Sequence, residues 1–324
     1  MLPAMDGQSV PISAIPNESA AAPSAANNAL AFIDLARLGR TDWWSATKAF
    51  LKLIGWQVLV SIVAGVALYF WGDALSLAAK EVAILVVATA GWYVGLRGAV
   101  RRSHGRPVMS LIAADQRLKL GRVALGMALW VCVIALVVAL TLPFQGLLDA
   151  VMMTEGRSHL AWPLPPDVIA VVLLSVALFP FQAAAEELVF RGWMTQTLGQ
   201  YLRQPWATAL VVAVLFALVH GFSLGAWAFP YYVTMSLSLS AITLLDGRLE
   251  LAIGVHTINN VCAILGNVLT SADPASPSLF LDSSPIPPWA LVQAIAQATL
   301  LYLGARWLIR RRPSQIAAVA LPIA

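Results

Sequence analysis

The sequence contains few charged residues. Only 11% of its 324 residues are Asp, Glu, Lys or Arg, while 60% are hydrophobic and the mean hydropathy is +0.79. A soluble domain has about 25% charged residues. The charged residues are too few to cover a core of this size, which argues against a soluble enzyme, a disordered protein and a nucleic-acid-binding protein. We therefore predict a polytopic membrane protein with no nucleic-acid partner.

Cysteine is also scarce. Its two copies, Cys132 and Cys262, lie inside apolar runs, whereas disulfides need paired sites in an oxidising compartment. We interpret both as buried apolar side chains that fill space between helices. The HExxH motif of zinc proteases is absent from the sequence. The pattern GxSxG occurs once, as GFSLG at residues 221–225, but it follows an apolar helical run rather than the strand that precedes the serine-hydrolase motif. No motif therefore indicates a serine or cysteine nucleophile.

Long apolar runs are what the sequence has in abundance. Each is close to the roughly 20 residues that cross a bilayer core as a helix. The fold class that we predict is therefore all-α, a polytopic membrane helix bundle with about eight transmembrane helices. The eight runs lie near residues 50–71, 81–98, 123–144, 167–190, 205–222, 227–245, 250–270 and 288–309.

We divide the chain into three parts. Residues 1–40 are expected to form a disordered N-terminal tail with an amphipathic end, because residues 1–30 are rich in Ala, Pro, Ser and Asn and show no apolar period. Residues 41–312 are expected to form the helix bundle, with its motif-bearing core at 167–270. Residues 313–324 are expected to be a C-terminal tail.

The basic residues indicate an orientation. With eight spans, the basic residues of the N-terminal region, of the loop 97–122 and of the C-terminal end all fall on one side of the membrane. The opposite side receives mostly acidic residues. Because cytoplasmic loops carry an excess of Lys and Arg, we expect a multi-pass protein of the cytoplasmic membrane with both termini in the cytoplasm. This consistency favours eight spans over six or seven.

A few ionisable and polar residues lie inside the apolar runs. Such groups are costly at membrane depth, so they normally face a polar interior and have a function. His104 and His159, in contrast, lie in loops, and we interpret them as solvated. The candidate site residues are Glu186, Glu187 and Arg191 in the fourth run, His220 in the fifth, and His256 and Asn260 in the seventh.

Helix geometry sorts the residues of the fourth run. Glu187 and Arg191 are four residues apart on one face, so they can form an ion pair, which is the structural interpretation of these two residues. Glu186 lies about 100° around the helix from Glu187 and is expected to point elsewhere. Glu186 and His220 each lie 17 residues from Arg203, in the turn between their helices. In an antiparallel pair they share a level, where a carboxylate and an imidazole can meet.

The seventh run adds a second histidine with an amide, because His256 and Asn260 are also four residues apart. A glutamate beside a histidine can hold and deprotonate a water molecule. A second histidine and an amide can donate hydrogen bonds to an oxyanion. The set therefore indicates attack of water on a peptide carbonyl. A proton relay in a transporter is a further interpretation, which the lack of an internal repeat disfavours.

The three segments resemble the CPBP family of CAAX proteases and bacteriocin-processing enzymes, also called Abi. The family motifs EExxxR, FxxxH and HxxxN match, in this order, Glu186–Arg191, Phe216–His220 and His256–Asn260. The motif-bearing region covers about 75 residues, 186–260, and every polar motif position is present. The resemblance implies an intramembrane endopeptidase of the type II CAAX-processing class.

The resemblance also implies roles for these residues. Glu186 and His220 would activate the water, and His256 and Asn260 would stabilise the oxyanion. Glu187 and Arg191 would shape the site.

For cofactors we expect none. The alternative is one zinc ion held by Glu186 or Glu187 with His220 and His256. The expected partners are membrane lipid and a peptide or protein substrate, prenylated or membrane-embedded. Some relatives act as scaffolds or bacteriocin-immunity factors, so a non-catalytic role is the alternative function.

Overall fold

The computed structural model describes residues 25–72, 77–141, 166–221, 224–270 and 285–311. Within these residues all of the assigned secondary structure is helical, so the predicted all-α class is confirmed. The long helices are α2 (Trp43–Trp71), α3 (Leu77–Arg97), α4 (Leu120–Thr141), α6 (Pro166–Glu187), α8 (Pro205–His220), α9 (Ala228–Asp246), α10 (Glu250–Thr270) and α11 (Pro288–Arg311). The short ones are α1 (Ala25–Asp34), α7 (Thr195–Leu202), the 3₁₀ helices η1 (Leu35–Leu38) and η4 (Val108–Leu111), and the π-helices η3 (Gly98–His104) and η6 (Leu188–Met194).

Each of the eight apolar runs contains a long helix. Five stretches of the described chain are long and apolar enough to span a membrane, and they lie in α2, α3 with η3, α4, α6 through α7, and α9. The multi-pass membrane bundle is thus confirmed. The remaining runs form α8, α10 and α11, of which α8 and the stretch Glu250–Gly266 of α10 are shorter apolar helices.

The outer helices present apolar side chains that a soluble protein would bury. Only 6% of the most apolar part of α2 is buried, and Ile62 and Val63 are more than half exposed. Trp43 and Trp71, at the two ends of α2, are also exposed, as indoles at a membrane interface are. Cys132 is exposed and Cys262 half-buried, and neither forms a disulfide, so the prediction that both are buried is wrong.

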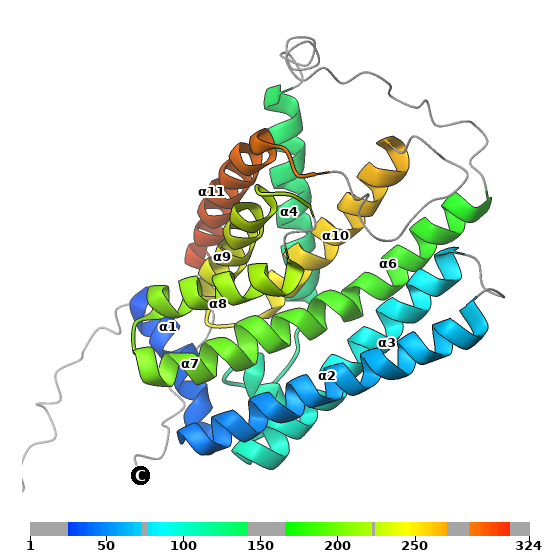
Figure 1. Cartoon of the computed structure of the whole chain (residues 1–324). Helices are drawn as coiled ribbons and strands as arrows, with labels where there is room; N and C mark the ends of the chain where they lie inside the picture. Colours follow the sequence, from blue (N-terminus) through cyan, green and yellow to red (C-terminus); the bar gives the residue numbers. More distant parts are fainter. Residues whose placement is uncertain (1–24, 73–76, 142–165, 222–223, 271–284, 312–324) are drawn as a thin grey trace, which may run out of the picture.

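Helices α6 and α10 lie at the centre of the bundle (Figure 1). Helix α6 packs between α3 and α10, while α10 packs between α6 and α4. Helix α2 covers α3, α11 contacts both α4 and α9, and α8 packs along α9. The two helices that carry the first and third motifs are therefore direct neighbours.

Glycines set the close approach of the helices. A Cβ added to Gly95 of α3 would lie 3.2 Å from the backbone of Leu53 in α2, and Gly91, four residues earlier, also faces α2. The contact of α4 with α10 is closer still. A Cβ on Gly126 would overlap the backbone of Leu251, and one on Gly254 would overlap the backbone of Val123. Helix α10 is therefore held against α4 from its first turns onward.

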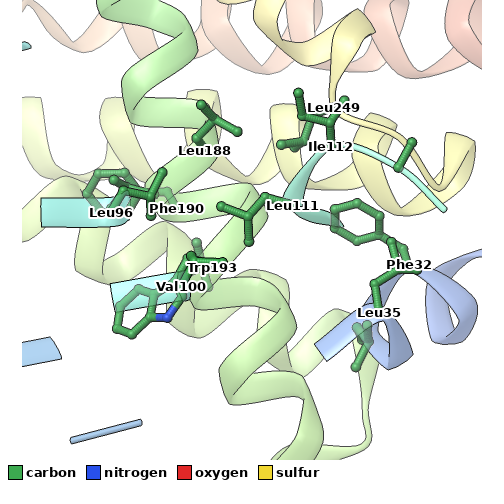
Figure 2. Close-up of a cluster of buried hydrophobic side chains, with 14 of the residues drawn as sticks. Phe32, Leu35, Leu96, Val100, Leu111, Ile112, Leu188, Phe190, Trp193 and Leu249 are labelled. Carbon is green, nitrogen blue, oxygen red and sulfur yellow. The ribbon is translucent and has the colours of Figure 1, made fainter. Parts of the chain in front are cut away.

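The N-terminal segment is more folded than its composition indicates. Of the predicted tail 1–40, residues 25–34 form α1 and 35–38 form η1, whereas residues 1–24 lie outside the described residues. Figure 2 shows Phe32 and Leu35 from this segment gathered with apolar side chains of distant elements, including Ile112 and Leu249. The apolar residues after position 29 give the segment a face that the bundle covers.

Polar contacts gather the basic segments at one end of the bundle. Arg203 pairs with Asp34 at 2.5 Å, and Arg106 donates to the Leu35 carbonyl at 2.9 Å. Burial lowers the pKa of Arg106 to about 10. Arg248, in the α9–α10 turn, donates to the Arg117 carbonyl at 2.9 Å. The N-terminal segment, the loop before α4 and two further turns thus share one side, as the eight-span prediction requires.

His104 is part of this packing and is not solvated, so that prediction is wrong. Its side chain is buried, its Nδ1 lies 2.7 Å from the Arg40 carbonyl, and Trp193 donates to its Nε2 at 3.0 Å. Because a carbonyl accepts and the indole N–H donates, the ring is neutral with its proton on Nδ1. It links the N-terminal segment to η6. His159 lies outside the described residues.

Candidate functional site

The site begins where α6 changes into η6. Glu186 and Glu187 are the last residues of α6, and Arg191 lies in the π-helical η6 that follows. Segments of π-helix are rare and occur frequently at functional sites. Glu187 and Arg191 are fully buried. The first motif therefore places two carboxylates and a guanidinium inside the bundle.

Glu187 connects α6 to α10. Its Oε1 accepts from Arg191 at 2.9 Å and from Nδ1 of His256 at 2.8 Å. Arg191 also donates to the hydroxyl and the carbonyl of Ser236 in α9, at 2.8 and 3.2 Å, and its guanidinium lies over the Phe216 ring. The predicted Glu187–Arg191 pair is thus present, and it also orients the His256 ring.

Glu186 approaches the same histidine. Its Oε2 lies 3.6 Å from Nε2 of His256. Its Oε1 accepts a hydrogen bond from Gln182, one helical turn earlier. Because Glu186 and Glu187 lie about 100° apart around the helix, the sequence predicted that their side chains point in different directions. Instead, Glu187 reaches one ring nitrogen of His256 and Glu186 reaches the other, because α10 places the imidazole between the two carboxylates.

One oxygen of each glutamate remains available. Within the described residues, Oε2 of Glu186 and Oε2 of Glu187 are buried without a hydrogen-bond partner. The charge of Glu187 is offset by Arg191 at its other oxygen. The oxygen of Glu186 that has no hydrogen-bond partner among the described residues lies toward Nε2 of His256. This arrangement suits a proton acceptor.

His220 lies beside this group. Its Nδ1–H donates to the Phe216 carbonyl at 2.8 Å, which leaves Nε2 as the free nitrogen. The ring is stacked between Phe216 and Tyr232, with centroid distances of 4.2 and 4.5 Å. In the described part of the chain, no hydrogen bond or ion pair joins His220 to Glu186. Glu186 and His220 were predicted to lie at the same level of two antiparallel helices, but that placement alone does not bring their side chains into direct contact.

Asn260 is connected to Glu186 by Gln182, a residue that the sequence prediction did not single out. Its Nδ2 donates to Oε1 of Gln182 at 2.9 Å, and Gln182 donates in turn to Glu186. Ser236 and Tyr232 are further polar neighbours that were missed. Gln182 could have been found, because it lies four residues before Glu186 in an otherwise apolar run.

A polar cluster fixes the start of α10. Arg248 donates to both oxygens of Glu250, at 3.0 and 2.6 Å, and to Asp115 at 2.9 Å. Although burial pushes the pKa of Arg248 down, these hydrogen bonds and the two negative charges raise it. Burial pushes the pKa of Asp115 up, but the hydrogen bonds from Lys119 and Arg248 and the positive charge of Arg248 outweigh it and lower that pKa. The cluster anchors the helix that carries His256 and Asn260.

The residues named for the alternative, a zinc site, do not converge in this arrangement. Within the described residues, no three His, Cys, Asp or Glu side chains are placed to hold a metal ion. His256 directs Nδ1 at Glu187 and Nε2 toward Glu186, while His220 stacks apart from them. A cavity of about 270 Å³ lies elsewhere, at the basic end of α4, α10 and α11, and contains none of the candidate residues.

Comparison with known proteins connects this site to a family. Residues 168–262 match the family model described as type II CAAX prenyl endopeptidase Rce1-like. The chain is 29% identical over 227 residues to the uncharacterized protein YyaK of Bacillus subtilis (strain 168). The aligned region covers 67% of this chain and 72% of that protein. No solved structure matches the chain significantly. The matched segment includes all six candidate residues, and the predicted family resemblance is confirmed.

Proposed function

Because residues 168–262 form a domain of the type II CAAX prenyl endopeptidase Rce1-like family, we propose that this multi-pass membrane protein is an intramembrane endopeptidase. The observation that carries the proposal is the buried Oε2 of Glu186, which has no hydrogen-bond partner among the described residues and lies 3.6 Å from His256. A positioned carboxylate of this kind can remove a proton from water. The six candidate residues would then share one reaction.

In the proposed reaction, Oε2 of Glu186 accepts a proton from a water molecule while the water oxygen bonds to the peptide carbonyl carbon. The free Nε2 of His220 helps to hold this water. The carbonyl oxygen becomes an oxyanion. Its collapse breaks the C–N bond, and Glu186 returns the proton to the leaving amine. The products are a carboxylic acid, which passes its proton to water or to the amine, and an amine, and the carboxylate of Glu186 is regenerated as the base.

The oxyanion would be stabilised by His256 and Asn260. Asn260 has an amide N–H beyond the one that it donates to Gln182. His256 donates from Nδ1 to Glu187, so it donates from Nε2 only as an imidazolium.

We propose a lipid-anchored or membrane-embedded peptide as the substrate. Glu186, Gln182 and Asn260 are half-buried at the surface between α6 and α10, in helices whose outer faces carry exposed apolar side chains. A segment that partitions into lipid would therefore reach the site from the bilayer. The test is an assay of purified protein in lipid vesicles, with a prenylated peptide and the same peptide without its prenyl group. Cleavage of neither peptide, nor of a membrane-spanning peptide, would contradict the proposal.

Cleavage is expected to need no metal ion. Incubation of the active protein with a strong chelator is expected to leave the rate unchanged within about twofold, because a glutamate base can act without a Lewis acid. The measurement is the cleavage rate before and after chelation, with and without added Zn²⁺. A rate that falls on chelation and returns with zinc would favour the zinc site of Glu186 or Glu187 with His220 and His256.

We also propose that the basic end faces the cytoplasm, with both termini on that side. The basic residues at this end support it. In a chain with Cys132 and Cys262 changed to Ser, Arg102→Cys is expected to react with an impermeant maleimide only after permeabilisation. Lys80→Cys, at the other end of α3, is expected to react in intact cells. The reverse pattern would invert the orientation.

A further inference from the structure

Gln182 lies on α6 one helical turn before Glu186, and its side chain joins two groups of the site. Its Nε2 donates to Oε1 of Glu186, and its Oε1 accepts from Nδ2 of Asn260 at 2.9 Å. Helix α6 supplies the carboxylate and α10 supplies the amide. Gln182 is therefore the hydrogen-bonded link between the group proposed as base and a group proposed to bind the oxyanion.

The two partners fix the orientation of the Gln182 amide. A flipped amide would place its oxygen against the carboxylate of Glu186, where both atoms only accept. It would also place its NH₂ against the NH₂ of Asn260, where both groups only donate, provided that Asn260 keeps its own orientation. Asn260 is held in turn, because its Oδ1 accepts from Nδ2 of Asn259 at 3.4 Å. The three amides and the carboxylate therefore form one directed chain of hydrogen bonds.

This chain makes the two oxygens of Glu186 different. Oε1 is occupied by Gln182, whereas Oε2 is buried, lacks a hydrogen-bond partner among the described residues and faces Nε2 of His256 at 3.6 Å. Without the Gln182 hydrogen bond, the carboxylate could rotate about its last bond and exchange the two oxygens, or turn both away from the substrate. Positioned groups lose much of their catalytic effect when they move by about 1 Å.

On the basis of the proposed peptidase function, we propose that Gln182 is a positioning residue. It holds Oε1 of Glu186 so that Oε2 acts as the base, and it aligns the Asn260 amide with the same substrate carbonyl. A merely structural role is the competing explanation, because polar side chains also join helices within membranes. The two roles differ in their effects on kcat, KM and the pH profile.

The experiment compares Gln182→Leu, Gln182→Glu and Glu186→Gln in the full-length protein in lipid vesicles. Gln182→Leu removes both hydrogen bonds at similar size and is expected to lower kcat by about 10–100-fold, the loss typical of residues that orient a catalytic group. Its KM is expected to change by less than about twofold, because no substrate contact is removed. The matched control is Gln57→Leu in α2, which is expected to retain wild-type kcat.

The glutamate variant gives a readout that a structural role would not move. In Gln182→Glu, a protonated carboxyl at this position can donate to Glu186, whereas an ionised one repels it. The variant leaves unchanged the other charged or titratable groups of the site, which are Glu187, Arg191, His220, Tyr232 and His256. Gln182→Glu is therefore expected to regain activity toward acid pH and to lose it toward alkaline pH, relative to wild type. This variant keeps the size and polarity of the site if the leucine variant does not fold.

The outcomes separate this proposal from the proposed function. If Glu186→Gln is inactive while Gln182→Leu keeps its kcat and Gln182→Glu keeps the wild-type pH profile, the positioning role is wrong and the peptidase function stands. If Glu186→Gln retains activity, the proposed function itself fails. A lower thermal stability of Gln182→Leu with an unchanged kcat would assign the residue a structural role and overturn the proposal.

Discussion

Replacing Glu186 with glutamine is expected to lower kcat for peptide cleavage by about 10²–10⁴-fold, the range that general acid–base catalysis contributes. The substitution keeps the size of the side chain and an oxygen that can accept from Gln182, as Oε1 of Glu186 does now. It removes the ability to take a proton from water. The KM is expected to change little, because the loss affects the transition state rather than substrate binding.

The control for this substitution is Glu81→Gln, which makes the same chemical change at a buried position of α3 outside the site. Both variants are expected to accumulate in the membrane, and only Glu186→Gln should be inactive. A cellular phenotype that survives Glu186→Gln would favour the scaffold or immunity role. Proton-coupled uptake in proteoliposomes that Glu186→Gln abolishes would favour a transporter.

The fold was largely predictable because the solvent imposes it. Spanning segments must satisfy their backbone groups internally, so each apolar run of sufficient length becomes a helix. The grouping of basic segments was also predictable, because it follows from counting spans. The packing of the N-terminal segment was not predictable. Its first residues are small and polar, and its apolar residues Phe32 and Leu35 are buried by contacts with a core that includes Ile112 and Leu249, which are distant in the sequence.

The sequence allowed the candidate residues to be listed, but it did not predict the contacts between them. Spacing along one helix predicts which residues share a face, and the Glu187–Arg191 pair follows from it. Spacing does not reveal the rotation of one helix against another. That rotation places His256 between Glu186 and Glu187. It also places the His220 ring against the Tyr232 ring rather than within hydrogen-bond distance of a carboxylate. Gln182 was missed because only the charged residues of the fourth apolar run were considered, whereas in the seventh run an amide was included beside a histidine.

Replacing Arg191 with methionine is expected to destabilise the protein by about 3–5 kcal/mol, the cost of leaving one partner of a buried ion pair alone. Glu187 and Arg191 are both fully buried, 2.9 Å apart. The loss also removes the two hydrogen bonds to Ser236. His256 remains as a donor to Glu187, so the protein is expected to fold with reduced stability. Reversible unfolding in mixed micelles of increasing SDS content measures the change.

A double substitution separates the ion pair from the rest of the site. Adding Glu187→Gln to Arg191→Met removes the uncompensated charge, and the coupling between two residues in contact is typically about 0.5–3 kcal/mol. The double variant is therefore expected to be more stable than Arg191→Met alone. The control Arg306→Met, at an exposed position of α11, is expected to change stability by no more than about 0.5 kcal/mol.

Activity is not expected to return with stability in the double variant. An amide oxygen at position 187 accepts a weaker hydrogen bond from Nδ1 of His256 than the carboxylate does, so the ring would be held less firmly toward the oxyanion. Recovery of both stability and kcat would assign Glu187 and Arg191 to the support of the helix alone. Recovery of stability without kcat would place Glu187 in the reaction, as the residue that orients His256 for the oxyanion.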